Sequence, residues 1–453
     1  MDPNLDQEEI AMEMQQGTNG AITILRIPMY IKEANRSLFD PRAVAIGPYH
    51  HGNQVTQDME AHKDRFCQGL FQRLGDKVNY QHATAHCTKG ALHCYSGHVG
   101  RYSPFMLMRD AGFILELIFR WVIEGSIHSD NYVRLILNSI YYDLLLLDNQ
   151  IPFFVLDRLF NIVKIHNPVF NDTNLLDLVI QFFNHDRSFS WANVNSNYPN
   201  ANQVLHLLDL QYKLAIGNNP VIEPPLDNIR FSQNACFNIC CRWNMPQGIP
   251  GANKLKNYGI RFQLNNDQQN KMFDVTFTGQ TMMIPGFTIN SGSKILLSNL
   301  FIYDQIIESL LGNNFFGDNQ IEGQEGNNVG AVISYVVLMK ALINSGDDAL
   351  VLQREGILQN LLSNEDEVAS FFNELGKCIM ADVSDHRYNS LFNDVNMYWR
   401  NRFNCHKYLA IFRKKHFKNP WTCLSLVGAI MLLSFSCTSM IFAILNYTRA
   451  RGY

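Results

Sequence analysis

Two adjacent histidines in the stretch AVAIGPYHHG, residues 43–52, are the first candidates for chemistry in this chain. Histidine titrates near neutral pH and serves as a general base, a proton shuttle or a metal ligand. His50 and His51 could therefore belong to a catalytic or metal site. The alternative is a shaped turn in which both histidines only form local hydrogen bonds.

Turn-forming residues surround this pair, because Gly47 and Pro48 precede it and Gly52 follows it. Apolar residues before the turn alternate as in a short strand, and helical spacing begins near Met59. We therefore predict a strand-to-helix corner in which Tyr49 packs and one of the two histidines hydrogen-bonds the loop.

Further histidines and cysteines crowd the first hundred residues and could supply a zinc site. His82 and His86 stand four residues apart, which places them on one face of a helix, and Cys94 with His98 could complete four ligands. The spacing is irregular, however, and no acidic partners accompany the pairs. We therefore predict ordinary polar or half-buried histidines and neither a metal nor another cofactor.

The sequence also lacks the local signatures of common enzyme sites. It contains no G-x-S-x-G nucleophile elbow and no G-x-x-x-x-G-K-[ST] phosphate-binding loop. A catalytic cysteine needs no local signature and stays open. We predict a protein without catalytic activity and without a small-molecule substrate, and the alternative is a cryptic site near GPYHHG and DLLLLDNQIP.

Five carboxylates lie inside or beside apolar helical patterns and could pair for acid–base catalysis: Asp110, Glu116, Asp143, Asp148 and Asp157. The triplet Asp148, Asn149 and Gln150 precedes Pro152, where a helix must end. Polar side chains at such a position can satisfy the backbone groups that the helix end leaves free. We predict that these residues form caps and buried polar networks.

Composition bounds the class of protein. The chain has 453 residues, 47% of them hydrophobic and 17% charged, with a formal net charge of −4. A chain of this size can bury a large hydrophobic core. No long block of basic residues is present, so we do not expect nucleic acid as a partner. Its ten cysteines include no C-x-x-C pair, which is compatible with a reducing compartment.

A charge-free run near the end of the sequence, Trp421–Leu445, is long enough to cross a bilayer. No acidic residue follows Asp394, whereas basic residues precede the run, among them Arg413, Lys414, Lys415 and Lys418. We predict a transmembrane helix over 421–445 that makes the lipid bilayer one partner of this protein.

Topology follows from the same charges. More basic residues precede the predicted span than follow it, so the positive-inside rule places the body in the cytosol. The N-terminus shows no apolar segment of a secretory signal, and the anchor would belong to the plasma membrane or a secretory-pathway membrane. The triplets at Asn35 and Asn171 would carry glycans only if the body were lumenal.

We predict a mainly α fold: a large helical body with a small antiparallel β insert and one C-terminal transmembrane helix. Residues 1–20 are predicted to be disordered, and the body covers 21–418. Within the body, residues 216–256 are rich in loops and 257–290 form the β section. A short tail, 446–453, follows the membrane span.

The helices of the body are predicted from apolar periodicity and from their ends. Residues 103–125 form one helix, and residues 135–163 form a helical pattern that Pro152 should break near Gln150. Later helices are expected over 332–345, 347–362 and 363–379. The last of these begins with a capping-box-like pair, Ser363 and Asp366.

The chain resembles the plant "domain of unknown function 247" family along nearly its whole length. The matching segments are RIPMYIKEANRSLFDPRAVAIGPYHHG, DMEAHKDRF with Glu60 and Lys63, RDAGFILELI, YYDLLLLDNQIPFFVLDRLF, HLLDLQY, ANKLKNYGIRF, FDVTFTGQTMMIPGFTI, YVVLMKALINS and FKNPWTCLSLVGAIMLL. Two departures from the family pattern are Ala111 before Gly112, and Asp148 where glutamate is common.

This resemblance implies a membrane-anchored protein whose domain has no assigned activity and therefore no catalytic residues to transfer. Some grass members of the family are linked to self-incompatibility loci, which implies pollen recognition by protein–protein binding to a partner that the sequence does not identify. Variable loops at 184–203 and 216–256 would suit such a role. The signature residues of 47–52, 60, 63 and 148–152 are expected to be structural.

Overall fold

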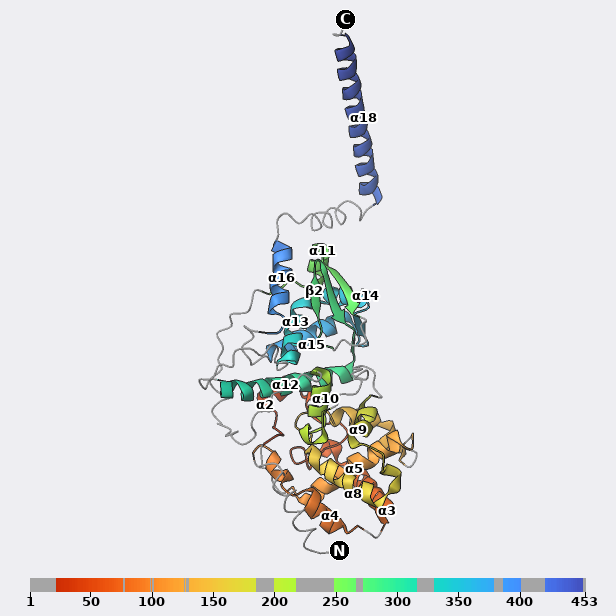
Figure 1. The fold of residues 1–453 in the computed structure, drawn as a ribbon, viewed down its shortest axis with the longest axis vertical. Helices are drawn as coiled ribbons and strands as arrows, with labels where there is room; N and C mark the ends of the chain where they lie inside the picture. Colours follow the sequence, from red (N-terminus) through yellow and green to blue (C-terminus); the bar gives the residue numbers. More distant parts are fainter. Residues whose placement is uncertain are drawn as a thin grey trace.

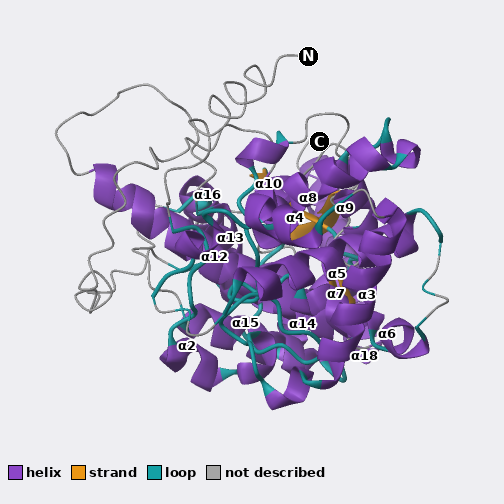
Figure 2. Cartoon of the chain, turned by 90° about the horizontal axis from the view of Figure 1, so that it is seen from below, coloured by secondary structure: helices purple, strands orange, loops and turns teal. Residues whose placement is uncertain are grey.

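The computed structural model describes residues 22–75, 78–97, 99, 102–125, 127, 130–184, 199–216, 248–265, 272–315, 330–378, 386–400 and 420–450. Helices dominate, as the sequence predicts, and the strands are short segments among them (Figure 2). The α-helices of the body are α2 (Met29–Ala34), α3 (Asp58–Leu74), α4 (Tyr80–Cys87), α5 (Pro104–Val122), α6 (Asn131–Leu135), α7 (Leu137–Asp143), α8 (Phe153–His166), α9 (Leu175–Phe183), α10 (Leu207–Ile216), α11 (Ala252–Asn257), α12 (Ser291–Phe315), α13 (Ala331–Leu342), α14 (Gly346–Arg354), α15 (Glu365–Lys377) and α16 (Asn389–Arg400).

The body is elongated, with the N-terminal helices at one end and the sheet at the other. Figure 1 shows α3, α4, α5, α8 and α9 together, α10 and α12 in the middle, and α11 and α13 to α16 around the strands. One cluster of buried apolar residues runs from Ile27 to Val395 through both ends. The two ends therefore share a continuous hydrophobic core.

Helix α5 is the central element of the N-terminal end. The Ser103 side chain caps its first turn by accepting from the Met106 amide, and Pro104 occupies the first helical position. Its residues are buried almost continuously from Leu107 to Phe119 because α3, α8 and α9 pack around it. Gly112 allows the closest approach to α3, since a Cβ there would lie 2.6 Å from Cys67 Sγ.

The helical pattern of residues 135–163 breaks earlier than predicted. Helix α7 ends at Asp143 rather than near Gln150, and α8 begins after Pro152. The side-chain Nε2 of Gln150 donates to the carbonyls of Leu144 and Leu146 at 2.8 and 2.7 Å. These side-chain hydrogen bonds replace the helical ones and hold residues 144–151 as a buried loop.

The β section is a mixed sheet, so the prediction of an antiparallel insert is only partly right. Strand β2 (Thr276–Thr278) pairs antiparallel with β3 (Thr281–Pro285), whereas β1 (Arg261–Asn265) pairs parallel with β3. A second, parallel pair joins β4 (Phe287–Ile289) to β5 (Leu358–Asn360). Alternation in the sequence reports which face of a strand is buried and not the direction of its neighbour.

Strand β5 also corrects the helix predicted over 347–362. Helix α14 ends at Arg354, and Gly356 has a positive φ of 72° that reverses the chain into β5. The next helix, α15, is capped by Asn364, whose side chain accepts from the Glu367 amide, and not by the predicted Ser363. The described end of the region predicted to be rich in loops, 216–256, contains helix α11 from Ala252 onward.

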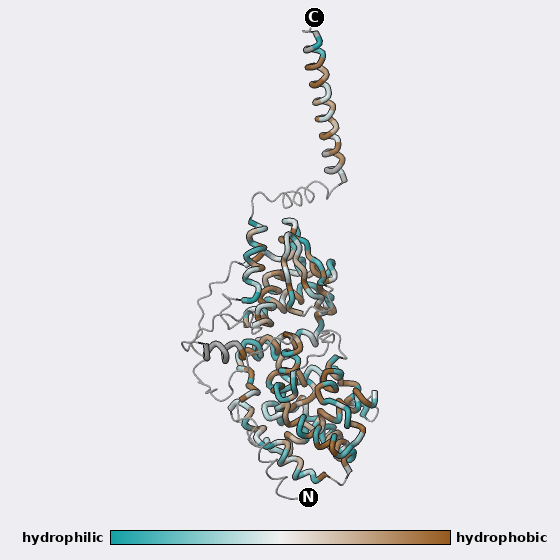
Figure 3. Tube along the Cα trace, in the orientation of Figure 1, coloured by the Kyte–Doolittle hydropathy of each residue, from teal (hydrophilic) through white to brown (hydrophobic). Residues whose placement is uncertain are grey.

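Helix α18 (Pro420–Ala450) stands apart from the body in Figure 1, and Figure 3 shows apolar residues along its length. Its stretch Val427–Tyr447 has the length and composition of a membrane span, and none of it is buried against the rest of the protein. Trp421 lies before this stretch and Leu445 within it. The predicted disordered residues 1–20 and the basic residues Arg413, Lys414, Lys415 and Lys418 lie outside the described part of the chain, as do 217–247 of the predicted loop.

Candidate functional site

Residues 42–47, which precede the two histidines, are buried except for Arg42, and the described structure assigns no strand to them. Instead, the Asp143 carboxylate at the end of α7 accepts hydrogen bonds from three consecutive backbone amides. Those of Arg42, Ala43 and Val44 donate to it at 3.0, 2.6 and 2.9 Å. Buried backbone N–H groups need hydrogen-bond acceptors, and here the Asp143 carboxylate supplies them in place of the carbonyls of a neighbouring strand.

Asn149 continues the same pairing one step along the segment. Its Oδ1 accepts from the Ile46 amide at 2.7 Å, and its Nδ2 donates to the carbonyl of Val44 at 3.0 Å. The same Nδ2 also donates to the carbonyl of Asp143 at 2.8 Å. One side chain thus joins residues 42–47 to the loop between α7 and α8.

Gly47 turns the segment at the point where a side chain would not fit. It has a positive φ of 71°, and an added Cβ would lie 2.6 Å from the carbonyl oxygen of Gln150. Its amide donates to Asp110 Oδ2 on α5 at 2.9 Å. The turn therefore needs glycine for both its conformation and its close packing.

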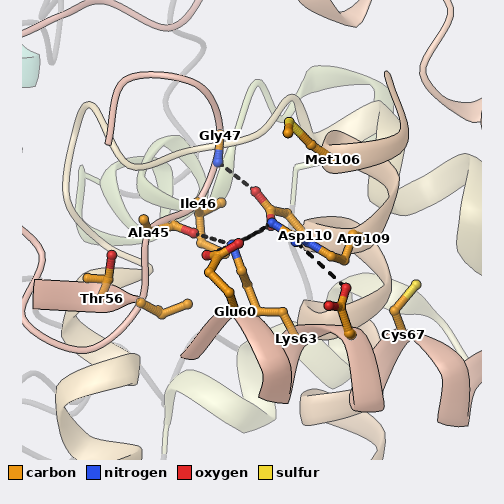
Figure 4. Close-up of polar contacts among 12 residues, drawn as sticks. Ala45, Ile46, Gly47, Thr56, Glu60, Lys63, Cys67, Met106, Arg109 and Asp110 are labelled. Carbon is orange, nitrogen blue, oxygen red and sulfur yellow. Dashed lines mark hydrogen bonds and ion pairs between the residues drawn. The ribbon is translucent and has the colours of Figure 1, made fainter. Parts of the chain in front are cut away.

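Lys63 on α3 is a buried cation at the centre of this arrangement (Figure 4). Its Nζ donates to the carbonyl of Ala45 at 2.8 Å and to Asp110 Oδ1 at 2.8 Å, and it pairs with Glu60 Oε1 at 2.7 Å. Glu60 in turn pairs with Arg109. A buried ammonium group is tolerable only with such partners.

A cavity of about 600 Å³ is lined in part by Tyr49 and His50 of the same turn. Asp148 is buried at its edge, where its carboxylate accepts from His50 Nε2 at 2.9 Å and pairs with Lys32 Nζ at 2.7 Å. Lys32 also donates to Asp40 Oδ1 at 3.1 Å. The Tyr49 hydroxyl donates nearby to the carbonyl of Ser96 at 2.8 Å.

The two buried aspartates differ in their electrostatics. Burial favours the neutral form of Asp148, but the hydrogen bond from His50 and the charge of Lys32 outweigh it and hold its pKa below the ordinary value. For Asp143 burial dominates over the three amide donors and raises the pKa to about 6. At neutral pH both carboxylates are ionised and bound.

The other predicted site residues contribute to the shape of the turn rather than to a common centre. Pro48 is half-buried, and His51 is exposed, with its ring centroid 5.4 Å from that of Tyr102 in an edge-on arrangement. Gly52 has a positive φ of 80° with open space around it. Pro152 precedes the first turn of α8.

The zinc candidates do not converge in the described part of the chain. His82 and His86 are exposed on α4, Cys94 is buried, and His98 is not among the described residues. Within the described ranges no three His, Cys, Asp or Glu residues are grouped to hold a metal ion.

Sequence reasoning missed Lys32, Asp40 and Tyr102 as members of these networks. The Tyr102 hydroxyl donates to Asp110 Oδ2, and Lys32 is buried against Asp148, more than a hundred residues away. The only local signal was a charged residue inside the apolar stretch RIPMYIK. Its partner could not be read from neighbours in the sequence.

The fold and this site define a mainly helical protein with a buried polar network and a C-terminal helix long enough to span a membrane. The model of the family DUF247, described as a plant protein of unknown function, matches residues 24–435. The chain therefore belongs to this plant family. The match extends from before the cavity into α18.

Two curated relatives from Arabidopsis thaliana resemble the chain. The UPF0481 protein At3g47200 is 26% identical over 456 residues, which covers 97% of this chain and 90% of the relative. The putative UPF0481 protein At3g02645 is 23% identical over 163 residues, or 34% of this chain and 29% of that protein. No solved structure matches the chain.

Replacing the buried Lys63 should destabilise the N-terminal end of the protein. In Lys63→Met, Asp110 loses its ammonium partner while it stays buried, and we expect the free energy of unfolding to fall by about 3–5 kcal/mol. Denaturant titration of the detergent-solubilised chain measures this loss. The control is Lys256→Met, which breaks the half-exposed pair with Glu355 and should cost about 1 kcal/mol or less. Equal losses in the two variants would contradict a central role for Lys63.

Stability should depend on pH through Asp143. The folded protein keeps a proton on this carboxyl up to about pH 6, whereas the unfolded chain releases it near 3.8. Relative to Asp143→Asn, the wild type should therefore lose stability as the pH rises from 4 to 6, by about 2–3 kcal/mol. Unfolding curves at several pH values for both proteins test this, and parallel pH profiles would refute it.

Proposed function

We propose that this protein is a membrane-anchored binding protein without catalytic activity, and that its helical body recognises another protein. The observation that carries the proposal is the state of the polar residues in the family signature. Asp143, Asn149 and Lys63 are buried and bonded to the backbone of the 42–47 segment. Such groups build a scaffold and are not available to a substrate.

The His50–Asp148 pair is the feature that favours an enzyme most, because a base with an orienting carboxylate is half of a hydrolytic triad. The pair needs a nucleophile on the remaining ring nitrogen. Within the described residues His50 contacts Asp148 and Lys32, and no hydroxyl or thiol is bonded to it. The pair therefore supports a structural role better than catalysis.

An exposed apolar surface next to the cavity supports recognition. Met29 lines the cavity and is 59% exposed, and Val55, two residues after the lining residue Asn53, is 68% exposed. Methionine adapts its shape to a partner and is common at binding surfaces. We propose that Met29 and Val55 contact the partner while the network beneath them keeps the surface rigid.

Within this proposal, a male determinant of grass self-incompatibility is the most concrete biological role. It rests on the family resemblance alone, and the loops suggested as variable lie largely outside the described residues. The role requires expression in pollen and co-segregation of alleles with pollen compatibility. It also requires that the recognition surface lie on the side of the membrane where pollen and stigma meet.

The membrane side can be tested directly. We propose from the basic residues before α18 that the body is cytosolic, in a plasma or secretory-pathway membrane. In sealed microsomes from plant cells, an N-terminally tagged chain should then be digested by added protease without detergent, and Asn35 and Asn171 should carry no glycans. Protection of the tag together with a glycosidase-sensitive mass shift would reverse the topology and place recognition outside the cytosol.

If Met29 and Val55 contact the partner, charged substitutions at these two positions should reduce proximity labelling of nearby proteins. Full-length chains fused to a proximity-labelling enzyme should label a defined set of proteins in pollen or leaf cells. Met29→Glu with Val55→Glu should reduce this labelling at least tenfold without changing the melting temperature. Ile165→Glu, at a position 78% exposed on α8, is the matched control. Equal labelling by all three proteins would contradict the proposed surface.

A further inference from the structure

The cavity beside His50 has a basic rim that the scaffold does not use. Arg26 and Arg36 both line the cavity, and both are exposed. Neither guanidinium forms an ion pair with a described residue. Deeper in the cavity, by contrast, Lys32 is paired with Asp40 and Asp148. Among the described lining residues, the lysine or arginine charge without an ion pair therefore belongs to the two exposed arginines.

Part of the wall of the same cavity is apolar. Ile27, Pro28 and Met29 line it beside the two arginines. Arginine binds carboxylates through two parallel hydrogen bonds, and the apolar wall suits side chains such as isoleucine or methionine. The chemistry of the cavity thus fits a peptide in which carboxylates alternate with apolar residues.

The N-terminal residues 1–21 of this chain have that composition. They contain five acidic residues, namely Asp2, Asp6, Glu8, Glu9 and Glu13, and no lysine or arginine. Ile10, Met12 and Met14 lie among them. The described part of the chain begins at Ile22, four residues before the first basic residue of the sequence, which is Arg26 in the cavity wall.

We propose that the acidic segment of residues 1–21 occupies the Arg26–Arg36 cavity of its own chain. Exposed ion pairs are individually weak, so the short tether to Ile22 is what makes occupancy favourable by raising the local concentration into the millimolar range. The segment would then compete with any acidic partner for this surface. That last consequence rests on the proposed function, whereas the occupancy itself does not.

The test uses the full chain in detergent micelles and a fluorescent peptide of residues 1–16 as the probe. One variant keeps the length of the chain but removes negative charge: Asp6→Asn, Glu8→Gln, Glu9→Gln and Glu13→Gln. Fluorescence anisotropy at low salt should show that this neutralised chain binds the peptide at least tenfold more tightly than the wild type, whose own segment competes. Binding should weaken as salt is raised.

A second pair of variants locates the site. In the neutralised chain, Arg26→Glu with Arg36→Glu should weaken peptide binding at least tenfold. The matched control, Arg134→Glu with Arg354→Glu, changes two exposed arginines away from the cavity and should leave binding unchanged. All four positions are exposed, so thermal melting should be the same for every variant.

Three results would overturn the proposal: no binding of the peptide to the neutralised chain, equal binding to the neutralised and wild-type chains, or binding that ignores Arg26 and Arg36. Competition that grows with wild-type protein concentration would assign the segment to a second copy of the chain and would also overturn it. None of these results bears on the labelling experiment with Met29 and Val55, so the two proposals fail separately.

Discussion

A buried backbone segment without a strand partner is the constraint on which the N-terminal end of this structure depends. Residues 43–47 are buried, and each backbone group there that lacked a partner would cost about 1–3 kcal/mol. Asp143 on α7, Asn149 in the α7–α8 loop, Asp110 on α5 and Lys63 on α3 bond five amides and two carbonyls of residues 42–47. The packing of α3, α5 and the loop after α7 is therefore fixed by side-chain hydrogen bonds as much as by apolar contact.

The same device joins this end of the molecule to the middle. Asn299 on α12 is fully buried and donates to the carbonyl of Leu38 at 2.9 Å. Its Oδ1 accepts from the amide of Leu147 at 2.9 Å. One amide side chain thus holds together helix α12, the chain just before residues 42–47 and the α7–α8 loop. Loss of a network of this kind is costly because each group that remains is left buried without a partner.

This arrangement explains why membership in the family says much about structure and little about activity. The residues that carry the family resemblance, such as Gly47, Lys63 and Asn149, are the ones that the buried segment needs. The recognition that we propose would instead use exposed residues, such as Met29 in the cavity lining and Val55 near it. A shared scaffold can therefore present different surfaces in different relatives.

The sequence alone determined the helical class, the position of the apolar C-terminal helix and the turn at Gly47, because periodicity, length and glycine chemistry are local properties. It also indicated that polar side chains before Pro152 bond backbone groups, which holds for Asn149 and Gln150, whereas Asp148 pairs with the side chains of His50 and Lys32. Only the tertiary structure decided which backbone those groups would meet, that β1 and β3 run parallel, and that Lys32 pairs with Asp148. These contacts join residues far apart in the chain, and such partners are chosen by packing in three dimensions rather than by spacing along the sequence.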